Sequence, residues 1–167
     1  MNLRTAKDIM VPIHAYATVK ENDTLKTALL HLHRALYTGS AGHRTLAVLD
    51  EYGNLTGFLT VRSILKSLEA LAYKESLQGG RHLPSVSFWA RLFLKNKIEK
   101  IAGAKVRDVM RPVEKIFVHE DTSLTEVARV ILLNRVNHIP VLDKEHRVVG
   151  IVRSIDLLDV IDEFLGS

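Results

Sequence analysis

The sequence of 167 residues contains no cysteine, so disulfide bonds and thiol chemistry are excluded. No apolar run reaches the eighteen or more residues that a membrane-spanning helix requires. Residues 1–8 also lack the apolar stretch of a secretory signal, so we expect a cytoplasmic protein without a membrane span. The composition, 47% hydrophobic and 25% charged, is typical of a soluble globular protein.

The motifs of common enzymes and metal sites are also missing. The histidines form no His-Glu-x-x-His pattern, and no nucleophile elbow or dinucleotide-binding fingerprint occurs. The segment 39–42 lacks the Gly-Lys-(Ser/Thr) end of a phosphate-binding loop. Asp156, Asp159 and Asp162 recur every third residue, which indicates a solvated helix face more than a metal site. We therefore expect no catalysis, no metal site and no required cofactor.

Positive charge is concentrated in the middle of the chain. Residues 74–107 carry eight Lys or Arg against two Glu, whereas the rest of the chain is slightly acidic. Two interpretations remain open: a solvated connecting segment, or a surface that attracts nucleic acid, acidic lipid or a phosphorylated ligand. A helix is predicted from Ser87 to Ile101, and its aromatic and leucine residues favour packing within the protein or on a dimer partner.

One pattern occurs twice in the chain, about a hundred residues apart. Asp-Ile-Met-Val-Pro, ending at Pro12, returns as Asp-Val-Met-Arg-Pro, ending at Pro112. Leu-Ala-Val-Leu-Asp, followed by Gly57, returns as Ile-Pro-Val-Leu-Asp, followed by Gly150. A repeat of about sixty residues is usually too small to bury its apolar face alone. We therefore expect the two copies to pack together.

Each repeat reads as strand, helix, strand, strand, helix. In the second copy we predict strands at 116–118, 138–142 and 148–152, with a polar turn between the last two. Ser123 and Glu126 have the capping-box spacing at the start of the first helix. The closing helix is predicted from apolar residues at helical spacing.

The first copy has the same elements with an insertion at 37–42. Its hairpin turn contains Gly53, which can adopt a positive φ. We therefore divide the chain into a first repeat at 1–70, a basic linker with a helix at 71–104, and a second repeat at 105–167.

This doublet resembles a tandem pair of cystathionine-β-synthase (CBS) domains, a Bateman module, everywhere except in the linker. The resemblance implies an α/β fold of two pseudo-symmetric β-α-β-β-α repeats packed together, with an extra linker helix. It also implies a regulatory module, not an enzyme, that binds an adenosine-containing nucleotide such as AMP, ADP or ATP in the cleft between the repeats. Family members commonly pair, so a homodimer and an unidentified effector protein are the expected partners.

The family's ligand signature is Gly-x-x-(Thr/Ser)-x-x-Asp, at the last strand and the start of the last helix. The second copy, from Gly150 to Asp156, keeps the carboxylate that would bind ribose but has Arg153 in place of the hydroxyl. The first copy keeps the hydroxyl of Thr60 and ends at Ser63, without the carboxylate. The resemblance thus implies one better site, organised by Asp156.

The residues assigned in this way to the nucleotide site are Asp156, Arg153, Ile151, Ser154, His138, Asn137, Arg44 and Thr60. Asp156 either binds ribose or serves only as an acidic residue at a helix N-terminus. Arg153 either clamps phosphate or is an exposed strand residue. His138 and Asn137 either reach the ligand or end a strand in solvent. The alternative function is a non-catalytic scaffold or dimerisation module with a vestigial cleft, whose basic linker contacts a partner protein or nucleic acid.

Overall fold

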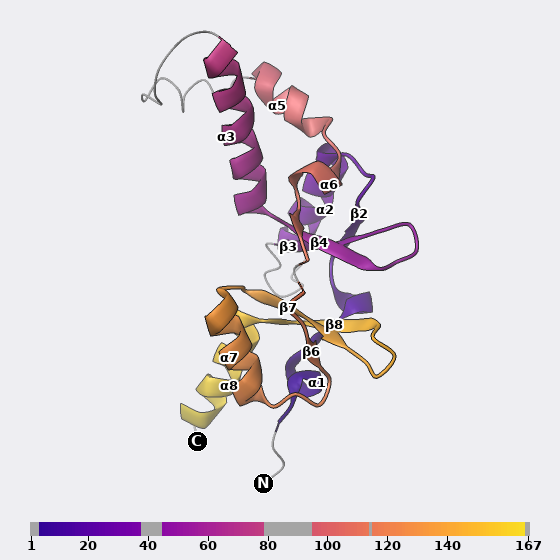
Figure 1. The fold of residues 1–167 in the computed structure, drawn as a ribbon, viewed down its shortest axis with the longest axis vertical. Helices are drawn as coiled ribbons and strands as arrows, with labels where there is room; N and C mark the ends of the chain where they lie inside the picture. Colours follow the sequence, from indigo (N-terminus) through magenta and orange to yellow (C-terminus); the bar gives the residue numbers. More distant parts are fainter. Residues whose placement is uncertain (1–3, 38–44, 79–94, 114, 166–167) are drawn as a thin grey trace. The chain divides into compact units, whose positions relative to one another are not determined.

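The computed structural model describes four stretches of the chain: 4–37, 45–78, 95–113 and 115–165. The chain folds into two packing units (Figure 1). Unit 1 comprises Met1–Tyr16 with Glu114–Ser167, and unit 2 comprises Ala17–Val113. Each unit contains one four-stranded sheet and its own helices, so the fold is α/β as the sequence predicted.

Unit 1 combines most of the second repeat with the beginning of the chain. Its sheet has the order β1-β8-β7-β6, formed by β1 (Val11–Pro12), β8 (Val148–Arg153), β7 (His138–Leu142) and β6 (Val118–His119). β6 runs parallel to β7, and the other two pairings are antiparallel. The helices are α1 (Ala6–Ile9), the 3-10 turn η1 (Ile13–Ala15), α7 (Leu124–Asn134) and α8 (Ser154–Leu165). Helices α7 and α8 lie side by side (Figure 1).

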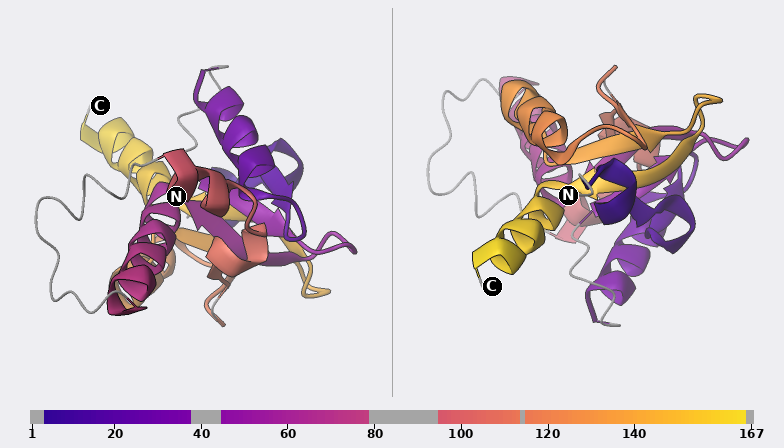
Figure 2. Two further views of the ribbon diagram at one scale, coloured as in Figure 1. Left: turned by 90° about the horizontal axis from the view of Figure 1, so that it is seen from above. Right: turned by 90° about the horizontal axis from the view of Figure 1, so that it is seen from below.

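Unit 2 has the same topology. Its sheet has the order β2-β3-β4-β5, formed by β2 (Thr18–Lys20), β3 (Thr45–Leu49), β4 (Leu55–Thr60) and β5 (Arg111–Pro112). The helices are α2 (Leu25–Tyr37), α3 (Val61–Gln78), α5 (Lys95–Ala102) and α6 (Val106–Val109). Helices α3 and α5 lie side by side (Figure 1; Figure 2, left). The predicted linker helix is helical from Lys95, and its part at 87–94 lies outside the described residues.

Each unit has its own apolar core, placed between the sheet and the helices. In unit 1, Val141 and Val152 from the central strands pack with Val127 and Ile131 from α7. In unit 2, the corresponding strand residues Val48 and Leu59 pack with side chains of α2, α3 and α6, which are Leu25, Ala28, Leu32, Ile64, Leu68, Val106 and Val109. Burial of each large aliphatic side chain stabilises the fold by roughly 1.5–3 kcal/mol.

Each sheet takes one edge strand from the other repeat. β1 belongs to the first repeat in sequence but pairs with β8, and β5 belongs to the second repeat but pairs with β4. Backbone hydrogen bonds attach the same segments: Ala6 N–H donates to the Thr122 carbonyl at 2.8 Å, and Val106 N–H donates to the Asp23 carbonyl at 2.9 Å. The sequence repeat and the packing unit therefore differ by a short segment that contains a one-turn helix and the edge strand, α1 with β1 in unit 1 and α6 with β5 in unit 2.

These edge strands lie directly against glycine. A Cβ atom added to Gly150 would lie 2.5 Å from Met10 Sδ and 3.0 Å from a backbone oxygen of β1. A Cβ atom added to Gly57 would lie 2.6 Å from Met110 Sδ and 2.7 Å from a backbone oxygen of β5. A side chain at either position would displace the edge strand, because protein interiors leave no room for such overlap. The Met-x-Pro motif and the glycine are thus the two sides of one packing contact.

Several local predictions can be compared with the structure. The hairpin strands at 138–142 and 148–152 are present, and Gly53 has a φ of 87°. The strand predicted at 116–118 begins only at Val118. The Ser123 hydroxyl accepts the backbone N–H of Glu126 at 3.3 Å, as a capping box requires. The Glu126 carboxylate instead accepts two hydrogen bonds from the Arg129 guanidinium, at 2.6 and 2.7 Å, so this half of the capping-box prediction was wrong.

The strand exchange predicts which fragments fold alone. Residues 17–113 contain all four strands of the unit 2 sheet, whereas residues 1–78 contain the whole first repeat but lack β5. We expect cooperative thermal unfolding, followed by circular dichroism, for the 17–113 fragment and a broad or absent transition for the 1–78 fragment. Equal cooperativity in the two fragments would contradict the importance of the exchanged strand.

The close contact between Gly150 and the edge strand predicts that alanine destabilises the protein more at this position than at a glycine with free space around it. Gly150→Ala should lower the free energy of unfolding by about 1–3 kcal/mol, because the new methyl group overlaps the edge strand. Gly103→Ala is a matched control, since its Cβ would meet nothing closer than 3.8 Å. This control should change stability by at most about 1 kcal/mol. Urea denaturation of both variants measures the difference, and similar values would disprove the packing argument.

Candidate functional site at the β8–α8 junction

The residues that sequence analysis singled out in the second repeat lie where β8 ends and α8 begins. Val152 points into the core of unit 1, so strand alternation places Ile151 and Arg153 on the opposite face of the sheet. Ile151 is completely buried. The side chains of Arg153 and Asp156 are only 13% and 6% exposed. Arg153 is therefore not the exposed strand residue that one interpretation of the sequence described.

Arg153 and Asp156 form an ion pair with several hydrogen bonds. The Arg153 Nε donates to the two carboxylate oxygens of Asp156 at 2.9 and 3.1 Å, and its Nη2 donates to Oδ1. The backbone N–H of Arg153 donates to Oδ2 at 2.7 Å. The hydrogen bond to Asp156 raises the pKa of the guanidinium. The two residues predicted to bind different parts of a ligand therefore bind each other in this structure.

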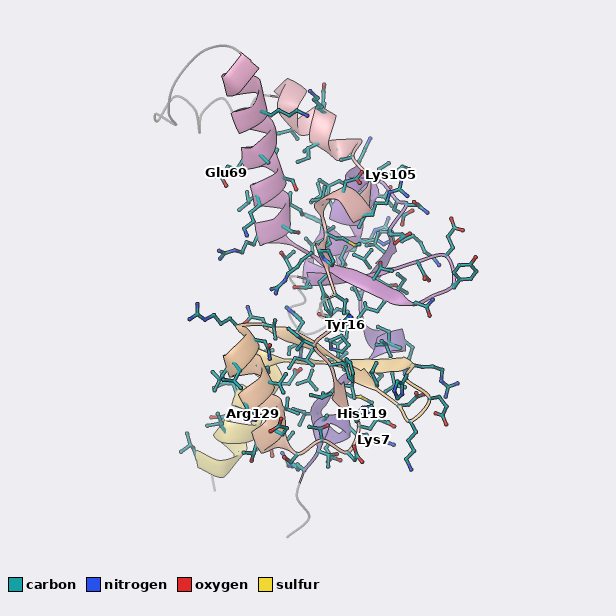
Figure 3. All side chains as sticks on the ribbon, in the orientation of Figure 1. Lys7, Tyr16, Glu69, Lys105, His119 and Arg129 are labelled. Carbon is teal, nitrogen blue, oxygen red and sulfur yellow. The ribbon has the colours of Figure 1, made fainter. Side chains whose placement is uncertain are left out.

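Tyr16 lies next to this pair and was missed by sequence analysis. It follows η1, which contacts β8, and its side chain is buried (Figure 3). Burial raises its pKa far above the ordinary value; the charge of Arg153 opposes this rise and that of Asp156 adds to it. Tyr16 is thus an uncharged, buried side chain beside the ion pair. The signal that could have revealed it was an aromatic residue shortly after the first Met-x-Pro motif.

Three more predicted residues lie beside the ion pair. His138 is paired in register with Arg153 across β7 and β8. The backbone N–H of Ser154 donates to the Asn137 carbonyl at 2.9 Å, which joins the start of β7 to the start of α8. Asn137 is exposed, whereas His138 and Ser154 are half-buried. The structure thus brings together the six predicted residues of the second repeat.

The two predicted residues of the first repeat are placed differently. Thr60 belongs to unit 2, and Arg44 lies outside the described residues. At the β4–α3 junction the Thr60 N–H donates to Ser63 Oγ at 3.0 Å, and the Ser63 N–H donates to Thr60 Oγ1 at 3.0 Å. The Ser63 hydroxyl also donates to the Thr60 carbonyl at 2.8 Å. Unit 2 therefore has a neutral hydroxyl pair where unit 1 has an ion pair.

Part of the basic segment has a structural use. Lys105 Nζ donates to the Asn22 carbonyl at 2.7 Å, and Arg107 Nη1 donates to Asn22 Oδ1 at 2.9 Å.

Within the four described stretches, no group of three or more His, Asp or Glu residues is arranged to hold a metal ion. Over the same stretches, every helix is too short or too polar to cross a bilayer.

Comparison with known proteins identifies the fold and the family. The family model described as the CBS domain matches residues 6–70 and 106–163. A CBS domain-containing protein of Dictyostelium discoideum is 26% identical over 148 residues, which cover 89% of this chain and 86% of that protein. The chloroplastic CBSX2 of Arabidopsis thaliana is 27% identical over 150 residues, covering 89% of this chain but only 59% of CBSX2.

Solved structures agree with this result. The crystal structure of CBSX2 in complex with AMP has a TM-score of 0.65 at 22% identity and covers 96% of this chain and 98% of the CBSX2 chain. The cytosolic domain of the Mg²⁺ channel MgtE in complex with ATP has a TM-score of 0.61 at 27% identity. That match covers 94% of this chain but only 48% of the crystallised MgtE chain. With both sequence repeats matched by the family model, this chain belongs to the CBS domain family and carries a tandem pair of CBS domains.

Proposed function

We propose that this chain is a regulatory module that binds an adenine nucleotide at the β8–α8 junction of unit 1. The observation that carries the proposal is the buried Arg153–Asp156 ion pair beside Tyr16. Two relatives support the ligand class, since CBSX2 was crystallised with AMP and MgtE with ATP. Regulation then requires only that the nucleotide binds one conformation of the module better than another.

A nucleotide carries partners for both members of the ion pair. The two ribose hydroxyls are hydrogen-bond donors that suit the Asp156 carboxylate, and the phosphate is an anion that suits the forked guanidinium of Arg153. In the structure the Arg153 guanidinium already donates to the Asp156 carboxylate, so the groups that would bind a nucleotide are bound to each other. Binding is therefore an exchange in which ribose replaces Arg153 on the carboxylate and phosphate replaces Asp156 on the guanidinium. A ligand with only one of these groups would leave a buried charge without its partner.

The same reasoning favours one dominant site per chain. Ser63 occupies the position of Asp156 in the first repeat but offers only a hydroxyl, which is already hydrogen-bonded to Thr60. Hydrogen bonds to a charged group contribute roughly 1.5–3 kcal/mol, against about 1 kcal/mol for neutral ones. This difference corresponds to about tenfold in affinity.

The function is tested directly by ligand-induced stabilisation. AMP, ADP and ATP at millimolar concentration should raise the unfolding temperature in a saturable way, because a ligand that prefers the folded state stabilises it by mass action. Asp156→Asn keeps the shape of the side chain but removes its charge, and it should weaken AMP binding at least tenfold by isothermal titration calorimetry. Ser63→Ala, the matched variant in unit 2, should change the affinity by less than threefold. Equal losses in the two variants would contradict a single dominant site, and no stabilisation by any of the three nucleotides would refute the proposed function.

The exchange mechanism predicts that one substitution moves two affinities in opposite directions. Arg153→Met keeps the apolar stem but removes the guanidinium, so AMP and ATP should bind at least tenfold more weakly. The same change frees the Asp156 carboxylate, so adenosine, which has no phosphate, should bind more tightly than it does to the wild-type protein. Calorimetric titration with AMP and adenosine measures both effects. A parallel loss for the two ligands would show that Arg153 does not compete with ribose.

A further inference from the structure

Two histidines that are far apart in the sequence lie next to each other in unit 1. His119 is the last residue of β6 (Figure 3), and His146 lies in the turn between β7 and β8. His119 pairs in register with Leu142, so the end of β6 lies beside the start of this turn. The centres of the two imidazole rings are 5.8 Å apart, and the ring planes are inclined by 58°.

The ring nitrogens of both histidines are available to bind a ligand. The backbone N–H of His119 donates to Thr122 Oγ1 at 3.0 Å, and that of His146 donates to the Asp143 carbonyl at 3.1 Å. Within the described stretches, neither imidazole ring makes a hydrogen bond to the protein. His119 is half-buried and His146 is exposed, so a solute can reach the pair from solvent.

The turn that carries His146 is held in place by the nearly buried Asp143. The Asp143 carboxylate accepts the backbone N–H of Glu145 at 3.0 Å and that of Arg147 at 2.9 Å. It also accepts a hydrogen bond from Arg147 Nε at 2.8 Å. The turn therefore has a fixed conformation, and the place of the His146 ring beside β6 does not depend on a loose loop.

His146 has a backbone conformation that favours glycine. Its φ is 62°, and the corresponding residue of the first repeat is Gly53, with a φ of 87°. A left-handed conformation costs a residue with a Cβ atom roughly 1–2 kcal/mol. Histidine at this position therefore makes the turn less stable than glycine would, while it brings a second imidazole next to the first. Such a cost is typical of a functional position.

Ring packing accounts for only part of this arrangement. The Phe117 ring lies edge-on to His119, with 5.7 Å between the ring centres, and aromatic rings attract each other at such distances. Any aromatic residue would serve for packing, whereas a pair of imidazoles also suits zinc, nickel and copper ions. Metal–nitrogen bonds of about 2.0–2.1 Å place two imidazole centres on one ion about 5–6 Å apart. The distance between His119 and His146 lies in this range.

We propose that His119 and His146 bind one divalent transition-metal ion of the zinc class in unit 1. Water fills the other coordination positions, because no third His, Asp or Glu of the described stretches is arranged with the pair. Two protein ligands bind zinc more weakly than the four of a closed structural site, so we expect micromolar affinity. Unit 2 has Lys20 and Gly53 at the corresponding positions and lacks this site.

Zinc titration of the full chain, prepared without a histidine tag, tests the proposal. Isothermal titration calorimetry with zinc chloride in a non-chelating buffer should show one ion per chain. His119→Gln and His146→Asn should each weaken zinc binding at least tenfold, because either change leaves a single imidazole. Asparagine is chosen at 146 because it tolerates the left-handed conformation. His14→Gln changes another exposed histidine of unit 1 and should leave the affinity within threefold of wild type.

Three results would overturn the proposal. Millimolar affinity in the wild-type chain would show that zinc binds adventitiously only. A loss in His14→Gln as large as in the other two variants would show that the pair has no special role. Two ions per chain, one of them lost in each pair variant, would show that the two histidines bind separate ions. Circular dichroism of each variant confirms that the chain is folded before zinc is added.

Discussion

The contact between a Met-x-Pro edge strand and a glycine is the constraint on which both units depend. At Gly150 and at Gly57 the backbone and methionine sulfur of the edge strand come so close that no side chain would fit. Because each edge strand comes from the other repeat, neither repeat contains a complete sheet. The chain must therefore contain both repeats to complete either sheet, which explains physically why this sequence occurs as a doublet. Glycine, conspicuous in the ligand signature, has a packing role in this protein.

The two units share a backbone but differ at the junction between the last strand and the last helix. In unit 1 this junction holds two opposite charges, Arg153 and Asp156, largely removed from solvent. In unit 2 it holds two hydroxyl groups, of Thr60 and Ser63, and each accepts the backbone N–H of the other residue at the start of α3. Both arrangements close the junction with hydrogen bonds across three residues, so the fold does not require the charges. A pair of charges that the fold does not require is the physical basis for our proposal that a ligand binds at unit 1.

Much of the fold could be predicted from the sequence, and the predictions that failed did so for physical reasons. The hairpin strands β7 and β8 were predicted closely because apolar residues are bounded by a polar turn. The exchanged strands β1 and β5 were not predicted, since a two-residue strand has no periodicity to detect. The resemblance to the family's ligand signature singled out Arg153 and Asp156, but their spacing alone did not indicate that they would bind each other. Tyr16 was missed because comparison of the repeats finds only residues that both copies share.

The differences between the repeats therefore carry more functional information than their similarities. Residues common to both copies, such as Gly57 and Gly150, build the sheets and are explained by packing. The Arg153–Asp156 ion pair at the β8–α8 junction is specific to the second copy, because the first copy has two hydroxyl side chains at the matching positions. The ion pair is largely buried, and its two charges suit a small ligand with both a hydrogen-bond donor and an anion. A duplicated fold can thus keep one packing solution in both copies while the chemistry at one strand–helix junction differs between them.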